Sequence, residues 1–114
     1  MTTFSSPSGV DHIVLIKAKP TATEQQMETM LTGVHSLAAI PGVAWVTVGP
    51  TFCDSAQDRR DGVDYVIYVR LESKEALQLY QDHALHVQVR DEMIRPICAE
   101  PPKAMDWASP IVAK

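Results

Sequence analysis

The chain has 114 residues, a length that suits one domain with a single hydrophobic core. Its formal charge of −4 is mild and its basic residues form no stripe along which a phosphate backbone could lie, so we expect no nucleic-acid partner. No apolar run approaches the length that spans a membrane, and the N-terminus lacks the basic and apolar regions of a signal peptide, so we expect no membrane partner either.

The chain has two cysteines, Cys53 and Cys98, which are far apart and belong to no CxxC pair. This pattern is typical of unpaired thiols in a reducing compartment, so we expect a cytoplasmic location. Neither cysteine has a basic neighbour in the sequence that would make it a convincing nucleophile.

The first half of the chain predicts a leader, a strand and a helix. Residues 1–10 are rich in Ser and Thr and are expected to be flexible. The β-branched segment His12–Lys17 predicts a strand, which Pro20 ends. Thr23 and Gln26 then have the spacing of a capping box at the start of a helix. The apolar stripe of this helix consists of Met27, Met30, Leu31, Val34 and Leu37.

The middle of the chain predicts two further strands and a second helix. Val43–Gly49 is the shorter strand, and a polar loop separates it from Val63–Leu71, in which side chains of alternating positions lie on opposite faces. Ser73 is the expected N-cap of the second helix. This helix is expected to bend or break near His83 and to continue to about Ile94.

A final strand around Ala104–Ala108 completes one domain over residues 11–108, with a tail over 109–114. The order β-α-β-β-α-β predicts an α+β ferredoxin-like fold, in which the helices cover one face of an antiparallel sheet. The other face is not polar enough to stay in water, because the third strand places Val66 and Tyr68 there. We therefore expect a homodimer in which two sheets pair face to face.

Several segments, taken in their order along the chain, resemble the stress-responsive A/B barrel domain family, a branch of the dimeric α/β-barrel proteins. The resemblance covers roughly residues 11–108. Its motifs are His12-Ile-Val-Leu-Ile-Lys17, Ile40-Pro-Gly-Val43, Tyr65-Val-Ile-Tyr-Val69, Glu72-Ser-Lys-Glu-Ala76 and Tyr80-Gln-Asp-His-Ala-Leu-His86. The family usually has proline where the last motif has Ala84, a difference that bears on the local bend more than on the chemistry.

The resemblance implies a site made of histidine and tyrosine. The family includes a plant polyketide cyclase that closes a linear tetraketide by aldol condensation without an organic cofactor. Its catalytic base and tyrosine correspond to His86 and Tyr80. Two of its cavity histidines correspond to His12 and Tyr65, so that part of the pocket differs, and His83 of the same motif is expected to bind substrate as well. The resemblance implies no cofactor and a small carbonyl or polyketide-like ligand.

These residue types suit proton transfer next to a carbonyl. A neutral imidazole can remove an acidic α-proton, and a nearby phenol can donate to the developing enolate oxygen. A structural interpretation is also open: Tyr80 fills the core, His86 caps the helix break, and His12 bonds a backbone carbonyl. Three functions remain: a cofactor-independent enzyme, a non-catalytic ligand-binding or stress-associated protein, and a cofactor-free monooxygenase.

A metal site is the remaining alternative. His12, His83 and His86 are three possible imidazole ligands, but the expected bend would spread them, so we expect no metal there. Some members of the family hold a divalent ion on backbone carbonyls after the first helix, and the sequence alone does not establish such an ion. The corresponding residues here are about Leu37, Ile40 and Val43.

Overall fold

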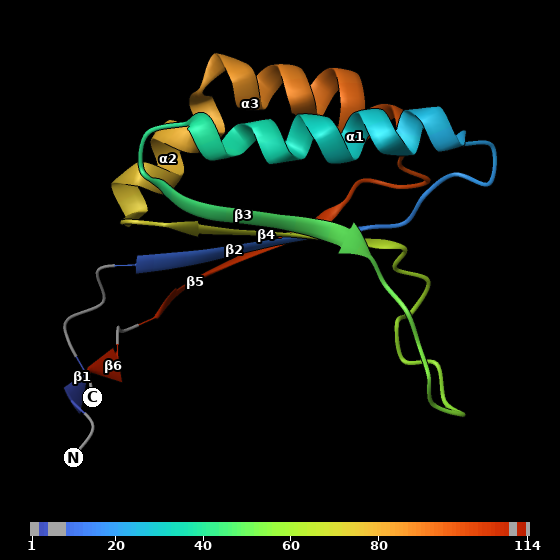
Figure 1. The fold of residues 1–114 in the computed structure, drawn as a ribbon, viewed down its shortest axis with the longest axis horizontal. Coiled ribbons are helices and arrows are strands. Elements are labelled where there is room, and N and C mark those ends of the chain that lie inside the picture. Colours follow the sequence, from blue (N-terminus) through green and yellow to red (C-terminus); the bar gives the residue numbers. More distant parts are fainter. Residues whose placement is uncertain (1–2, 5–8, 110–111, 114) are drawn as a thin grey trace.

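A computed structural model of the chain describes residues 3–4, 9–109 and 112–113. Four strands form one antiparallel sheet in the spatial order β3-β4-β2-β5. Their bounds are β2 (Gly9–Ile16), β3 (Val43–Pro50), β4 (Tyr65–Leu71) and β5 (Lys103–Ser109). The helices α1 (Glu24–Ser36), α2 (Lys74–Asp82) and α3 (Ala84–Val89) lie on one face of this sheet (Figure 1). The expected antiparallel ferredoxin-like fold is therefore confirmed.

The two longer helices begin at the residues that the sequence indicates. The Thr23 hydroxyl accepts a hydrogen bond from the Gln26 N–H at 3.1 Å, and Gln26 Oε1 accepts one from the Thr23 N–H at 2.9 Å. The Ser73 hydroxyl accepts a hydrogen bond from the Ala76 N–H at 3.0 Å. None of the helices in the described ranges combines the length and apolarity that crossing a bilayer requires.

After its first helix the chain makes a tight turn towards β3. The 3-10 turn η1 (Leu37–Ala39) extends α1, and Gly42 then adopts a φ of 90°. A Cβ atom at Gly42 would lie 2.7 Å from the Cβ of Ala76 in α2. Glycine is needed here for both its conformation and its size.

The second helical segment changes direction at His83, which confirms the predicted break. His83 ends α2 with an extended backbone (φ −64°, ψ 138°), and its Nδ1 accepts a hydrogen bond from the Leu85 N–H at 3.1 Å. After α3 the chain continues through a π-helical stretch, η2 (Arg90–Ile94), and a 3-10 turn, η3 (Arg95–Ile97). Pro96 has no N–H and cannot continue α-helical bonding, and the widened turn comes directly before it.

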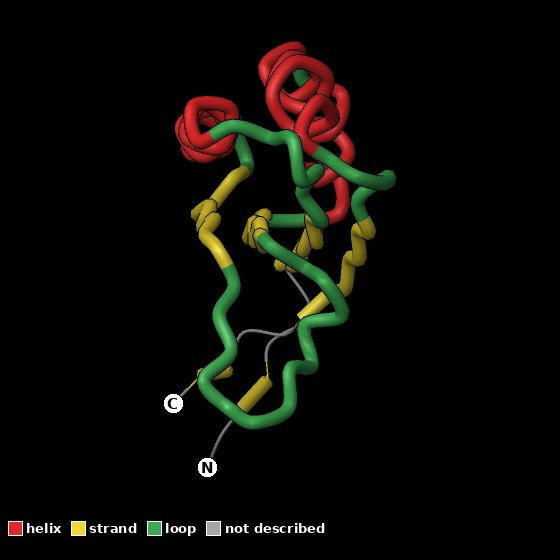
Figure 2. The backbone as a smooth tube through the Cα atoms, turned by 90° about the vertical axis from the view of Figure 1, so that its right-hand side faces the viewer, coloured by secondary structure: helices red, strands yellow, loops and turns green. Residues whose placement is uncertain are grey.

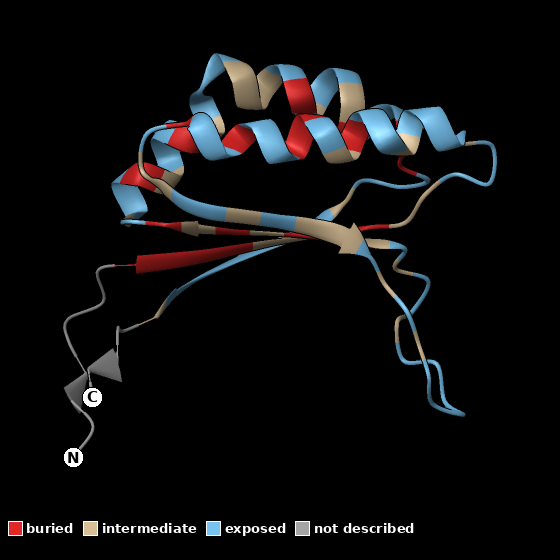
Figure 3. Ribbon diagram, viewed as in Figure 1, coloured by how far each residue is buried: buried red, intermediate tan, exposed pale blue. Residues whose placement is uncertain are grey.

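The hydrophobic core lies between the helices and the sheet (Figure 3). Alternate residues of β4, namely Ile67, Val69 and Leu71, are buried, as the sequence pattern predicts. The buried core consists of Ile16, Met30, Val34, Leu37, Ile40, Ile67, Val69, Leu71, Ala76, Tyr80, Val89, Ile94, Ile97 and Cys98. This layer joins all three helices to the central strands.

The opposite face of the sheet is covered by no described helix and carries large apolar side chains. Cross-strand pairing places Ile13 beside Tyr68 and Met105, and Leu15 beside Val66. The side chains of Trp45, Met105 and Trp107 are 50%, 48% and 45% exposed. We call this surface the open face; it comprises Ile13, Leu15, Trp45, Val66, Tyr68, Met105 and Trp107.

A buried charge pair lies at one end of the open face. Asp11 accepts hydrogen bonds from the Tyr68 hydroxyl, from Arg70 Nη1 at 3.0 Å and from the Ser109 hydroxyl at 2.6 Å. Burial by itself would raise the pKa of Asp11, but these three hydrogen bonds lower it below its ordinary value. The carboxylate therefore stays ionised and paired.

The first strand begins earlier than the sequence predicts. β2 begins at Gly9 rather than at His12, and Gly9 and Val10 are buried. Gly9 pairs with Ser109 of β5, and the Arg70 guanidinium occupies the space that a side chain at Gly9 would need. Residues 1–2 and 5–8 of the expected leader, and residues 110–111 and 114 of the expected tail over 109–114, lie outside the described residues. Within them, β1 (Thr3–Phe4) pairs with β6 (Val112–Ala113).

Candidate active site

Three aromatic rings from three different elements meet between the helices and the sheet. His12 comes from β2, Tyr80 from α2 and His86 from α3. The Tyr80 ring is central: its centroid lies 5.9 Å from that of His12 and 4.6 Å from that of His86. We call these three residues the ring cluster. The structure thus brings together both residues of the predicted catalytic pair and one predicted substrate-binding residue.

The helix break at His83 fixes the position and the tautomer of His86. His86 Nδ1 lies 3.0 Å from the backbone oxygen of Gln81, in the last turn of α2. Since a carbonyl oxygen can only accept a hydrogen bond, Nδ1 carries the hydrogen. In the neutral ring Nε2 is then unprotonated and can act as a base.

The surroundings of His86 favour its neutral form. Burial lowers the pKa of His86, and the hydrogen bond to Gln81 opposes this effect only in part. The charges of Arg90 and His12 lower the pKa further, whereas Asp91 raises it. The pKa lies below the ordinary value of 6.5, so the ring is neutral at pH 7.

A carboxylate that the sequence analysis did not single out holds His12. His12 Nδ1 hydrogen-bonds to Asp106 Oδ1, and the two residues are direct partners across the β2–β5 pair. The expectation that His12 bonds a backbone carbonyl is therefore wrong. The Asp106 carboxylate accepts the Nδ1 hydrogen and orients the ring. Only the strand register brings these residues together, and the sequence contains no direct signal for it.

The Tyr80 hydroxyl has no hydrogen-bond partner among the residues that the structure describes. The side chain is only 2% exposed. Burial raises the pKa of Tyr80 above its ordinary value of 10, so the phenol keeps its proton at neutral pH. It is available to donate a hydrogen bond to a ligand oxygen.

Two other predicted substrate-binding residues lie apart from the ring cluster. Tyr65 pairs with Ile16, whereas His12 pairs with Val69, so Tyr65 is displaced along β4. Four residues of strand correspond to about 13 Å. His83 is exposed, and its Nδ1 caps α3. Neither residue joins the three rings.

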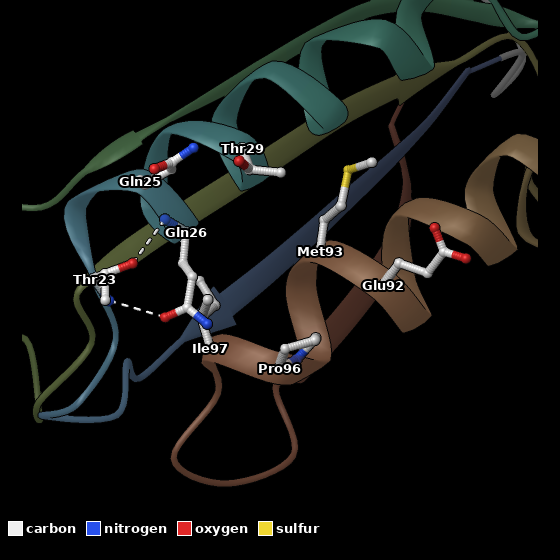
Figure 4. Close-up of a pocket in the computed structure, with 8 residues that line it drawn as sticks. All are labelled: Thr23, Gln25, Gln26, Thr29, Glu92, Met93, Pro96 and Ile97. Carbon is white, nitrogen blue, oxygen red and sulfur yellow. Dashed lines mark hydrogen bonds between the residues drawn. The ribbon is translucent and has the colours of Figure 1, made fainter.

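Several pockets of the described chain also lie away from the ring cluster. One of about 350 Å³ lies between the start of α1 and η2 (Figure 4). Its lining includes Thr29, Glu92 and Met93, and Gln26 beside them is engaged in the capping box. No residue of the ring cluster lines it.

The described residues hold no group of three His, Cys, Asp or Glu side chains that could share a metal ion. The arrangement of three imidazoles that the sequence left open therefore does not form. In the turn after α1, the carbonyls of Leu37 and Ile40 accept hydrogen bonds from the Ile40 and Val43 N–H groups, at 3.1 and 3.2 Å. These contacts do not test the divalent ion that some members of the family hold at this turn.

Known proteins resemble the chain over most of its length. The family model "Stress responsive A/B Barrel Domain" matches residues 10–108. A stress-response A/B barrel domain-containing protein of Arabidopsis thaliana is 33% identical over 98 residues, 86% of this chain and 36% of that protein. The chain thus spans about a third of the length of this relative.

Solved structures share the fold. A dimeric ferredoxin-like protein of unknown function from Thermobifida fusca is 27% identical with a TM-score of 0.74, covering 89% of this chain and 91% of that one. Hydroxynitrile lyase from Passiflora edulis has a TM-score of 0.81 at 18% identity, covering 91% of this chain and 95% of that one. The second likeness is one of fold alone.

The central position of Tyr80 predicts a large difference between two substitutions. Tyr80→Ala removes a fully packed ring and should lower the free energy of unfolding by about 3–5 kcal/mol. Tyr80→Phe keeps the ring and removes a hydroxyl without a described partner, so it should cost less than about 1 kcal/mol. Urea unfolding of both variants measures the difference. Equal costs would mean that the hydroxyl is part of the structural core.

Proposed function

The chain belongs to the stress-responsive A/B barrel (Dabb) domain family, and from that premise we propose that it is a cofactor-independent lyase- or cyclase-type enzyme acting on a small carbonyl compound. His86 is the base, Tyr80 the hydrogen-bond donor, and His12 with Asp106 the second polar group of the site. One observation carries the proposal: a neutral His86 with a free Nε2 lies against a protonated Tyr80 whose hydroxyl has no partner among the described residues.

The proposed reaction moves one proton out of the substrate and returns it. His86 Nε2 takes a proton from the carbon next to a carbonyl, and the electron pair of the C–H bond passes into an enolate. Tyr80 donates a hydrogen bond to the enolate oxygen. The enolate carbon attacks a second carbonyl of the same molecule, and the resulting alkoxide recovers the proton from His86. His12, oriented by Asp106, faces the substrate as the second polar group of the site.

The fold similarity to hydroxynitrile lyase from Passiflora edulis supports a lyase-type reaction in one respect. That protein is a hydroxynitrile lyase, so the fold can host a lyase. At 18% sequence identity, the substrate of that enzyme cannot be assigned to this chain. The plant polyketide cyclase also differs from this chain, because it has a cavity histidine where this chain has Tyr65.

One observation favours a non-catalytic role. Tyr80 is 2% exposed, and the pocket between α1 and η2 does not reach it. In a binding or stress-associated protein, the same three rings would serve as core packing. The two functions differ in a measurable way, because only the enzyme converts a carbonyl compound.

A panel of β-diketones, aromatic ketones and hydroxynitriles tests the proposal by thermal stabilisation and by product formation. We expect a compound that raises the melting temperature and is converted, and His86→Gln should lower the conversion rate about 100-fold or more. His35→Gln is the matched control, because His35 is exposed on α1, and this variant should keep the wild-type rate.

The pH profile of the same reaction gives a second readout. Since burial lowers the pKa of His86, the wild-type rate should fall with decreasing pH around a midpoint below 6.5. Stabilisation without conversion would favour the non-catalytic role. Full activity in His86→Gln would show that another group is the base.

We further propose that the chain forms a homodimer through the open face. Trp45, Met105 and Trp107 are about half exposed on this face, and a second sheet would cover them. The charge of Asp11 is already paired with Arg70, so covering this end of the face leaves no unpaired carboxylate at Asp11. The Thermobifida fusca neighbour is described as dimeric, which supports the same arrangement.

Sedimentation equilibrium at micromolar concentration tests the dimer. The wild-type chain should sediment as a dimer, and Trp107→Glu should be monomeric because it buries a charge in the interface. Leu79→Glu is the control: Leu79 is 67% exposed on α2, away from the open face, and its replacement should leave the dimer intact. A monomeric wild type, or a dimeric Trp107→Glu, would contradict the proposed interface.

A further inference from the structure

A second pocket lies where the loop between β3 and β4 meets the ends of β2 and β5. It has a volume of about 220 Å³, and its apolar lining comes from Leu15, Val63 and Pro101. The loop extends beyond the strands on the side away from the helices (Figure 2). Leu15, a residue of the open face, and its cross-strand partner Lys103 lie on that side too, so the pocket occupies one corner of the open face, on the side of the sheet opposite to the ring cluster.

The pocket is basic in a chain that is acidic overall. Four basic side chains line it, those of Lys17, Arg59, Arg60 and Lys103. Two acidic side chains, Asp61 and Glu100, also line it, which leaves a net formal charge of +2 in a chain of −4. Clustered positive charge of this kind raises the local concentration of anions.

Two of the four cations have no carboxylate partner among the described residues. Lys17 Nζ lies 3.3 Å from Glu100 Oε1, and Arg60 Nη2 lies 2.6 Å from Asp58 Oδ2. Arg59 donates only to the Gln57 side-chain oxygen, at 3.1 Å, and Lys103 forms no ion pair within the described ranges. Arg59 and Lys103 are therefore available to bind an external anion.

One wall of the pocket is a tight hairpin turn. The Val63 N–H donates to the Arg60 backbone oxygen at 3.0 Å, and the two residues between them, Asp61 and Gly62, have φ values of 54° and 79°. Two successive positive φ values are typical of a rigid hairpin turn with glycine in second place. The turn holds Arg60, and Arg59 directly before it, at the pocket.

The loop between β3 and β4 and the segment around Glu100 and Pro101 form two walls of the pocket. Both are hydrogen-bonded to residues 16–18, at the end of β2 and directly after it. On one side, Asp64 donates from its N–H to the Ile16 oxygen at 2.8 Å, and its carboxylate accepts from the Ala18 N–H at 2.7 Å. On the other side, the Ala99 N–H donates to the Lys17 oxygen at 2.8 Å. The pocket is thus built by backbone contacts from three segments rather than by mobile side chains alone.

We propose that this corner pocket binds a small organic anion, with its carboxylate or phosphate group held by Arg59 and Lys103 and its apolar body against Leu15, Val63 and Pro101. The planar guanidinium of Arg59 matches two oxygens of such a group, and Lys103 adds a point charge. The site shares no residue with the ring cluster, so it goes beyond the proposed acid–base activity and is independent of it.

Titration of the uniformly ¹⁵N-labelled chain, followed by NMR, tests the proposal with four probes: benzoate, phenyl phosphate, inorganic phosphate and benzyl alcohol. At least one aromatic anion should produce saturable shifts of the amide signals of Lys17, Asp61 and Gly62. Comparing the affinities of benzoate and phenyl phosphate shows whether the pocket prefers a carboxylate or a phosphate group. Inorganic phosphate should bind more weakly because it lacks an apolar body, and neutral benzyl alcohol should not bind.

Three variants complete the test. Arg59→Gln and Lys103→Gln should each weaken the affinity about fivefold or more, and Lys103→Glu should weaken it further. These side chains are exposed, so the variants should fold normally. Lys74→Gln is the matched control, since Lys74 is exposed at the start of α2, and it should bind like the wild type. Absence of saturable shifts, equal binding of benzyl alcohol, or equal weakening in the control would overturn the proposal.

Discussion

The candidate site depends on one constraint, the change of helix direction at His83. In a continuous α-helix, six residues separate Tyr80 and His86 by about 600°, which would place the rings on different sides and about 9 Å apart along the axis. The extended backbone at His83 ends α2, and His83 Nδ1 accepts a hydrogen bond from the free N–H of Leu85 in α3. The two rings then meet at 4.6 Å, and the Gln81 oxygen freed at the end of α2 receives the Nδ1 hydrogen of His86.

The period of two along the strands separates two surfaces of different character. In β2, His12 faces the helices while Ile13 faces the other way. In β5, Asp106 likewise faces the helices and Met105 faces the other way. The ring cluster and its supporting carboxylate therefore lie on one side of the sheet, and the apolar open face lies on the other. A register slip of one residue would exchange the two, so the same strand pairing holds both the site and the proposed dimer surface.

Features that depend on neighbouring residues could be predicted from the sequence. The caps at Thr23 and Ser73, the break at His83 and the alternation in β4 are all local, and the structure confirms them. Features that depend on long-range register could not. Asp106 lies 94 residues from His12, and the pairing of Gly9 with Ser109 extends β2 beyond the predicted strand. The resemblance groups Tyr65 with the cavity residues, but its position along β4 places it away from the rings.

The central claim is that His86 is a neutral base whose hydrogen is on Nδ1 and whose Nε2 is free. ¹⁵N NMR of the histidine-labelled chain between pH 5 and 8 tests it most directly, with His86→Gln to identify the signals. We expect a protonated Nδ1 and an unprotonated Nε2 at pH 7, and a titration midpoint below the ordinary 6.5. A hydrogen on Nε2 at pH 7, or a midpoint above 6.5, would contradict it.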